Sequence, residues 1–126
     1  MILKTYKELK VWQQSFDLCK QVYRITKIFP KEEIYGLTSQ IRRAAVSIPS
    51  NIAEGYGRKT TPEYLRGLYI AYGSLCELET QIMLARELEF TQSDEADKIS
   101  DTIGNIERML KALIRKLEEK TAGTRG

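Results

Sequence analysis

The sequence predicts an all-α protein, an antiparallel up-down four-helix bundle with a proline-kinked second helix. Apolar residues recur at the three-and-four spacing of an α-helix in four segments, and the alternation typical of strands is absent. Short connections between these segments place consecutive helices side by side and antiparallel. At 126 residues the chain is long enough for one core but not for two. We therefore expect a single domain over residues 1–120.

The first helix carries apolar side chains over an unusually wide face. One stripe consists of Leu9, Trp12, Phe16, Cys19 and Tyr23, and a second stripe beside it consists of Val11, Leu18, Val22, Ile25 and Phe29. A helix that is apolar over this width has to be covered on two sides. Pro30 is expected to end it, because proline cannot continue a helix.

The second helix is predicted from Glu32 to Tyr56, straight through Pro49. Its apolar residues keep their register across the proline: Ile34, Leu37, Ile41, Ala45, Ile48 and Ile52. A helix that stopped and restarted would have no reason to keep this register. Proline has no N–H for the carbonyl of Ala45, and its ring bends the helix at a cost of about 3 kcal/mol unless packing compensates. Gly55 and Gly57 are expected to end the helix.

The third and fourth helices begin at recognisable start signals. In "TTPEY", Thr60 or Thr61 can cap the third helix, and Glu63 can close a capping box on Thr60. The core stripe of this helix is Tyr64, Leu68, Ala71, Leu75, Leu78, Ile82 and Ala85. The fourth helix follows "EFTQSDEAD", with Thr91 or Ser93 as its cap and acids in its first turn. Its stripe is Ile99, Ile103, Ile106, Leu110, Leu113 and Leu117. The last residues, 121–126, have nothing to bury and are predicted to be disordered.

Apolar side chains beyond these stripes predict self-association. The third helix adds a second apolar set: Leu65, Tyr69, Tyr72, Cys76 and Met83. Together with the second stripe on the first helix, this set exceeds what the interior of a monomeric bundle can bury. Such a surplus is typical of a surface that contacts a partner.

The composition argues against an enzyme, a metal site and a bound cofactor. The chain contains no histidine, which removes the commonest zinc ligand and the usual general base near neutral pH. Its two cysteines, Cys19 and Cys76, form neither a metal cluster nor a disulfide framework. We expect no catalytic residues and no small-molecule substrate. No apolar run is long enough to cross a membrane, and the charged start is unlike a signal peptide, so a cytoplasmic protein is expected.

The charge is distributed unevenly along the chain. Residues 1–60 carry eleven Lys or Arg against five Asp or Glu, a net charge of +6, whereas residues 61–126 carry nine against twelve, a net charge of −3. This asymmetry permits head-to-tail self-association or contact with a polyanion, and it is also compatible with ordinary solvated helix faces. The candidate nucleic-acid-binding residues are Arg42, Arg43, Arg58, Lys59, Lys10 and Arg24. Tyrosines among them (Tyr6, Tyr35 and Tyr56) could stack on bases.

A polar stripe runs along the second helix beside its apolar line. It consists of Gln40, Arg43, Ser47, Asn51 and Glu54, at spacings that allow hydrogen bonds along the helix. One interpretation is a solvated flank. The other is a polar network at a helix or subunit interface, with Glu79 of the third helix as the carboxylate partner of Arg43.

Two runs, "YGLTSQIRRAAVSIPSNIAEGYGR" and "EYLRGLYIAYGSLCELETQI", together with the opening "YKELKVWQQSFDLCKQVYRITKIFP", carry a family resemblance. Over about residues 6–118 the chain resembles the bacterial 23S rRNA intervening-sequence proteins. The signature residues present are Gln40, Arg43, Ala44, Ala45, Ser47, Pro49, Asn51, Ala53, Glu54 and Gly55.

The resemblance implies a ring-like homopentamer of four-helix bundles, encoded within 23S ribosomal RNA genes. The accessory proteins of diversity-generating retroelements are similar in fold, and they bind nucleic acid and a reverse transcriptase as basic pentamers. The resemblance thus favours an oligomer that binds RNA through its basic surface. The alternative is a ring that contacts only other proteins.

Overall fold

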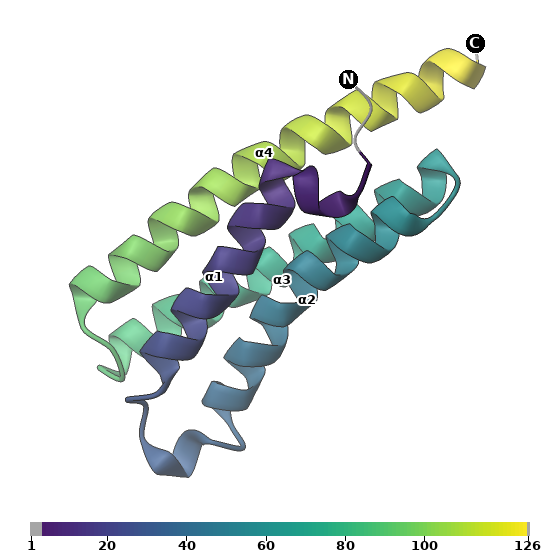
Figure 1. Cartoon of the computed structure of the whole chain (residues 1–126). Coiled ribbons are helices and arrows are strands. Elements are labelled where there is room, and N and C mark those ends of the chain that lie inside the picture. The colour runs from purple at the N-terminus through teal and green to yellow at the C-terminus, as the bar shows by residue number, and fades with distance from the viewer. Residues whose placement is uncertain (1–3, 126) are drawn as a thin grey trace.

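The computed structural model describes residues 4–125, which form four α-helices and two short 3-10 helices. Helix α1 spans Lys10–Thr26, α2 spans Leu37–Gly57, α3 spans Thr61–Glu87 and α4 spans Ser93–Arg125. The 3-10 helices η1 and η2 span Tyr6–Glu8 and Lys31–Glu33 and precede α1 and α2. Successive α-helices run in opposite directions, and α4 packs against both α1 and α3 (Figure 1). No strand occurs in the part of the chain described, and the predicted all-α bundle is confirmed.

The core lies along the middle of the bundle and contains one stripe of α1 and most residues of the predicted stripes of α2, α3 and α4. Each helix contributes side chains that are fully buried, such as Val22, Ile48, Leu78 and Ile106. Burying a side chain of this size stabilises the fold by about 1.5–3 kcal/mol. None of the helices within residues 4–125 is both long and apolar enough to span a membrane.

Only one of the two apolar stripes on α1 faces the core. The buried stripe is the one containing Leu18 and Val22. Along the other stripe, Trp12 and Cys19 are half-buried, and Phe16 and Tyr23 remain 48% and 41% exposed. The bundle therefore covers α1 on one side and leaves an aromatic edge open.

Helix α2 begins five residues later than the sequence predicts. The predicted start, Glu32, lies in η2, and the regular helix starts at Leu37. The chain interrupts the helix at Gly36, whose φ of −113° and ψ of −115° lie outside the helical region. The Glu33 carboxylate then accepts a hydrogen bond from the Leu37 N–H at 3.1 Å, which satisfies one free amide of the new helix. Register alone could not reveal this break, because Ile34 keeps the apolar spacing although it is exposed.

Helix α2 continues through Pro49, as predicted, and Pro49 is buried within it. The proline has no N–H to offer the carbonyl of Ala45. That carbonyl instead accepts a hydrogen bond from the Cys19 thiol of α1 at 3.1 Å. A side chain of the neighbouring helix thus replaces the missing backbone donor. The kink at Pro49 stays a prediction.

Two glycines allow α2 and α3 to approach closely. A Cβ atom on Gly67 would lie 2.7 Å from the Asn51 carbonyl oxygen and 2.8 Å from the Gly55 Cα. Gly55 is therefore buried in the contact between the helices, and α2 extends to Gly57. Helix α3 starts as predicted, with the Thr60 hydroxyl accepting a hydrogen bond from the Glu63 N–H at 3.3 Å.

Helix α4 is longer at its C-terminal end than the sequence predicts. It continues to Arg125, whereas the sequence predicts disorder over residues 121–126. No proline interrupts this segment, and each residue added to an existing helix gains a hydrogen bond without a new nucleation cost. Of the predicted disordered segment, only Gly126 lies outside the described residues.

Candidate functional site

The guanidinium of Arg42 is held in place by two residues of α1. Its Nε donates a hydrogen bond to the Thr26 hydroxyl at 2.8 Å, and its Cζ lies 4.7 Å from the centre of the Tyr23 ring. Thr26 is buried, and its hydroxyl in turn donates to the carbonyl oxygen of Val22 at 2.7 Å. Both partners of Arg42 are uncharged. Its positive charge is therefore oriented but not neutralised.

Arg42 lines a groove of about 460 Å³ between the end of α1, the α1–α2 connection and the first half of α2. The lining residues are Tyr23, Ile34, Tyr35, Thr38, Ser39, Arg42, Arg43 and Val46. This set contains two arginines, two tyrosine rings and no carboxylate. Within residues 4–125, neither Arg42 nor Arg43 forms an ion pair. The groove can therefore attract an anion that carries a flat or apolar group.

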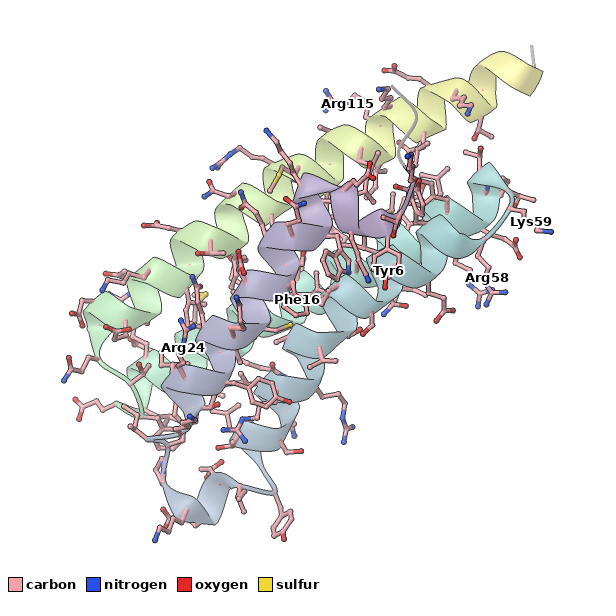
Figure 2. The ribbon with its side chains drawn as sticks, viewed as in Figure 1. Tyr6, Phe16, Arg24, Arg58, Lys59 and Arg115 are labelled. Carbon is pink, nitrogen blue, oxygen red and sulfur yellow. The ribbon has the colours of Figure 1, made fainter. Side chains whose placement is uncertain are left out.

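A row of aromatic rings continues along the exposed edge of α1. The ring centres of Tyr6 and Trp12 lie 5.2 Å apart, and Trp12 stacks on Phe16 at 5.1 Å. The ammonium group of Lys20 lies 5.7 Å from the centre of the Phe16 ring. In Figure 2, Tyr6 and Phe16 lie along the same side of the bundle as α1. This edge thus joins three aromatic rings and one basic side chain.

The predicted nucleic-acid-binding residues do not form one patch. Arg42 and Arg43 share the groove, whereas Arg24 lines a different cleft, between α1 and α4, with Lys98 and Glu95. Lys10 is exposed at the start of α1.

Arg58 and Lys59 lie at the α2–α3 turn, far along the bundle from Arg24 (Figure 2). Arg58 also forms an ion pair with Glu54 at 3.3 Å, which offsets its charge. Of the six predicted residues, the structure brings only Arg42 and Arg43 together.

The predicted polar network forms only in part. Ser47 and Ser74 of α3 share a hydrogen bond of 2.8 Å, and the Asn51 amide donates to the Ser47 carbonyl oxygen at 2.7 Å. Gln40, Arg43 and Glu79 are exposed, and in the described part of the chain no ion pair joins Arg43 to Glu79. The hydrogen bond that this stripe makes to α3 is thus the one between Ser47 and Ser74. The sequence did not reveal the role of Ser74, because nothing local distinguishes a serine that faces a neighbouring helix.

A second set of polar contacts joins α3 to α4. Tyr72 donates a hydrogen bond to Glu107 at 3.0 Å, and Lys111 forms an ion pair with the same carboxylate at 3.4 Å. The hydrogen bond from Tyr72 lowers the pKa of Glu107, and the Glu107 carboxylate raises the pKa of Tyr72. Nearby, Tyr69 donates to Glu118 at 2.5 Å. These side chains border a second groove of about 460 Å³, with Gly73, Ile114 and Arg115 among its lining.

The side chains described form no cluster of three or more histidine, cysteine, aspartate or glutamate residues suited to a metal ion. The groove beside Arg42 contains hydroxyl groups and arginines but neither a nucleophile paired with a base nor a pair of carboxylates.

The model of the 23S rRNA-intervening sequence protein family matches residues 7–112. The chain belongs to this family. The family resemblance predicted from the Pro49 region is therefore confirmed. The groove beside Arg42 is a feature of this intervening-sequence protein.

The fold is also seen in a crystal structure of a protein of unknown function from the S23 ribosomal protein family of Bacteroides thetaiotaomicron. The two structures agree with a TM-score of 0.78 and 22% sequence identity, over 83% of this chain and 95% of the other. At this identity the likeness shows a common fold and no more. No curated protein matches the chain.

Proposed function

We propose that this intervening-sequence protein is a non-enzymatic, cytoplasmic RNA-binding protein that acts as a homo-oligomer, in the pentameric form that its family resemblance implies. The observation that carries the proposal is the Arg42 guanidinium, fixed by Thr26 and Tyr23 without a carboxylate partner. A phosphate that binds to the Arg42 guanidinium supplies the negatively charged partner that this side chain lacks within the protein. Arg43 is exposed in the same groove and adds a second cation. RNA is favoured over other polyanions because of the ribosomal RNA in the family's description.

The orientation of Arg42 matters for affinity. A free surface arginine loses side-chain entropy when it binds, whereas Arg42 is already held. Its Nε is occupied by Thr26, and the two terminal nitrogens remain to donate in parallel to phosphate oxygens. Such contacts hold any RNA sequence equally well, since phosphates carry no sequence information.

The test is fluorescence anisotropy of a labelled, structured RNA at several salt concentrations. We expect binding whose logarithm falls linearly with the logarithm of the salt concentration. Replacing both arginines (Arg42→Gln with Arg43→Gln) should weaken binding and reduce the salt slope by about one unit for each phosphate that the protein no longer neutralises.

The matched control is Arg115→Gln with Lys116→Gln, which removes the same charge from two adjacent exposed residues of α4. Equal losses in both variants would show that general charge, not the groove, attracts the RNA. No binding by the unmodified protein at low salt would overturn the proposal.

A second candidate function is an assembly ring that binds proteins but no RNA. It is favoured by apolar side chains that α3 leaves half exposed: Tyr69, Ile70, Met83, Leu84 and, at the end of the helix, Leu88. Leu65, which the sequence predicted as part of the contact surface on this helix, is buried within the monomer and does not belong to that surface. This function requires a stable oligomer together with an absence of RNA affinity in the anisotropy experiment.

A further inference from the structure

The groove beside Arg42 contains exposed rings as well as cations. Tyr35 is 95% exposed at the rim, Ile34 beside it is 55% exposed, and Tyr23 lies on the α1 side. An aromatic ring so exposed gains nothing for the fold, because it contacts almost no neighbour. Its face remains open for a flat partner.

Tyr35 and the cations lie on the same short stretch of chain, whereas Tyr23 comes from α1. Tyr35 and Ile34 precede α2, and Arg42 and Arg43 follow within its first two turns. A ligand that contacts the rings and the arginines together has a planar group and an anionic group close to each other. Nucleotides have this form, with a base and a phosphate joined by a ribose. Ser39, which is half-buried and also lines the groove, offers a hydroxyl group to that ribose, whereas Thr38 beside it is buried.

The exposed ring of Tyr35 also indicates whether the groove binds paired or unpaired RNA. In a duplex both faces of every internal base are covered by the neighbouring base pairs, and the grooves expose only base edges, ribose and phosphate. A ring can stack on a base only where the base is unpaired, as in a loop, bulge or single strand. Phosphate contacts alone would serve a duplex equally well, and the exposed ring of Tyr35 would then have no role.

We infer that the groove accepts one unpaired nucleotide, so that the ligand is a single-stranded or looped segment of RNA and not a duplex. The base stacks on Tyr35 at the rim, and the phosphate binds Arg42 and Arg43. This inference rests on the proposed RNA-binding function and specifies which form of RNA occupies the site.

The experiment compares one short labelled RNA alone and annealed to its complement, by anisotropy at a fixed salt concentration. We expect the single strand to bind about tenfold more tightly or better, from stacking that the duplex cannot make. Tyr35→Ala should remove most of this preference while leaving the salt slope unchanged, because the variant keeps every cation. Tyr35→Phe should retain it, since the ring is kept.

The control is Ile28→Ala, an apolar side chain that is 68% exposed outside the groove and outside the helices. Because Tyr35 contacts so little, its replacement by alanine leaves the fold intact, which circular dichroism verifies. Equal affinity for strand and duplex would overturn the inference and leave the RNA-binding function standing. A preference for the strand that survives Tyr35→Ala would overturn the assignment to this groove. Binding of neither RNA would overturn the proposed function together with the inference.

Discussion

A missing side chain at position 67 sets how closely two helices of the bundle approach. Gly67 of α3 faces the backbone of α2, where its nearest neighbours are the Asn51 carbonyl oxygen and the Gly55 Cα. Backbone atoms cannot rotate away as a flexible side chain can. Any Cβ at this position must push the helices apart.

We expect Gly67→Ala to lower the free energy of unfolding by about 1–3 kcal/mol, the usual cost of overpacking a close contact. Urea denaturation measures this directly. Gly73→Ala is the matched control on the same helix, since a Cβ there would meet nothing within 4 Å. Alanine should stabilise the helix at Gly73 by about 0.5–1 kcal/mol. Equal stabilities of the two variants would contradict the close approach of α2 and α3.

Cys19 makes folding sensitive to alkaline pH. Burial raises the pKa of its thiol from 9.0 to about 11. The folded protein thus keeps the proton that the unfolded chain releases near pH 9, and the thiol needs that proton to donate to Ala45. A group whose pKa is raised on folding contributes stability below the unfolded pKa, and that stability is lost as the pH rises through the folded value.

We therefore expect the free energy of unfolding to fall between about pH 9 and about pH 11 more steeply in the unmodified protein than in Cys19→Ser. Serine keeps a hydroxyl donor but does not titrate in this range. Burial also raises the pKa of Tyr64 to about 12, but both proteins share that effect, and the difference between them isolates Cys19. Parallel pH profiles in urea denaturation would rule out this role of the thiol.

At the scale of an element, α2 shows how a helix tolerates an internal proline. The apolar register across Pro49 predicts the continuous helix, and the structure agrees. The register does not reveal what satisfies the carbonyl of Ala45, because the donor comes from α1, 26 residues earlier in the chain. A buried carbonyl without a donor is costly, so the Cys19 thiol and Pro49 form a matched pair.

The pairing of Cys19 with Pro49 can be measured with a double-mutant cycle. Cys19→Ala should destabilise the unmodified protein by leaving the buried Ala45 carbonyl unsatisfied. In the Pro49→Ala background the new backbone N–H supplies that carbonyl, and the same Cys19→Ala change should cost about 1 kcal/mol less. Denaturation of the four proteins gives the coupling energy. If the effects of Cys19→Ala and Pro49→Ala on stability were additive, the Cys19 thiol would not compensate for the donor that Pro49 lacks.

At the scale of the whole molecule, the bundle leaves two different surfaces open. The α1 edge is aromatic and lies in the basic half of the chain, whereas α3 exposes aliphatic side chains in the acidic half. Two unlike surfaces on one chain suit a head-to-tail contact, which closes into a ring when the rotation between neighbours allows it. This is the form of self-association that the proposed homo-oligomer requires.

We expect light scattering to give a mass several times the 14.5 kDa of the chain, five times if the proposed pentamer forms. Met83→Ser with Leu84→Ser should lower that mass, since both side chains are about half exposed and their removal takes apolar area away from the α3 surface. Each change should alter the stability of a monomer by less than about 0.5 kcal/mol, so a change in mass reports the interface. Ile28→Ser, at an exposed apolar residue outside the helices, is the control. A mass of one chain for the unmodified protein would refute the assembly.

The sequence by itself determined the four helices, the core stripes of α2, α3 and α4, the capped start of α3 and the passage of α2 through Pro49. These features depend on local signals, namely the helical period, capping residues, glycine and proline, which act over a few neighbouring residues. It also predicted six basic residues for nucleic-acid binding, four arginines and two lysines, but as separate positions along the chain.

The tertiary structure decided the contacts between residues that are far apart in the sequence, which local signals do not determine. It selected which stripe of α1 enters the core, replaced the expected Arg43–Glu79 pair with Ser47 and Ser74, and placed Arg42 against Tyr23 and Thr26. Each of these outcomes depends on how two helices are turned against each other. That rotation follows from the packing of the whole core, so the distance between side chains far apart in the sequence is fixed only when the bundle is complete.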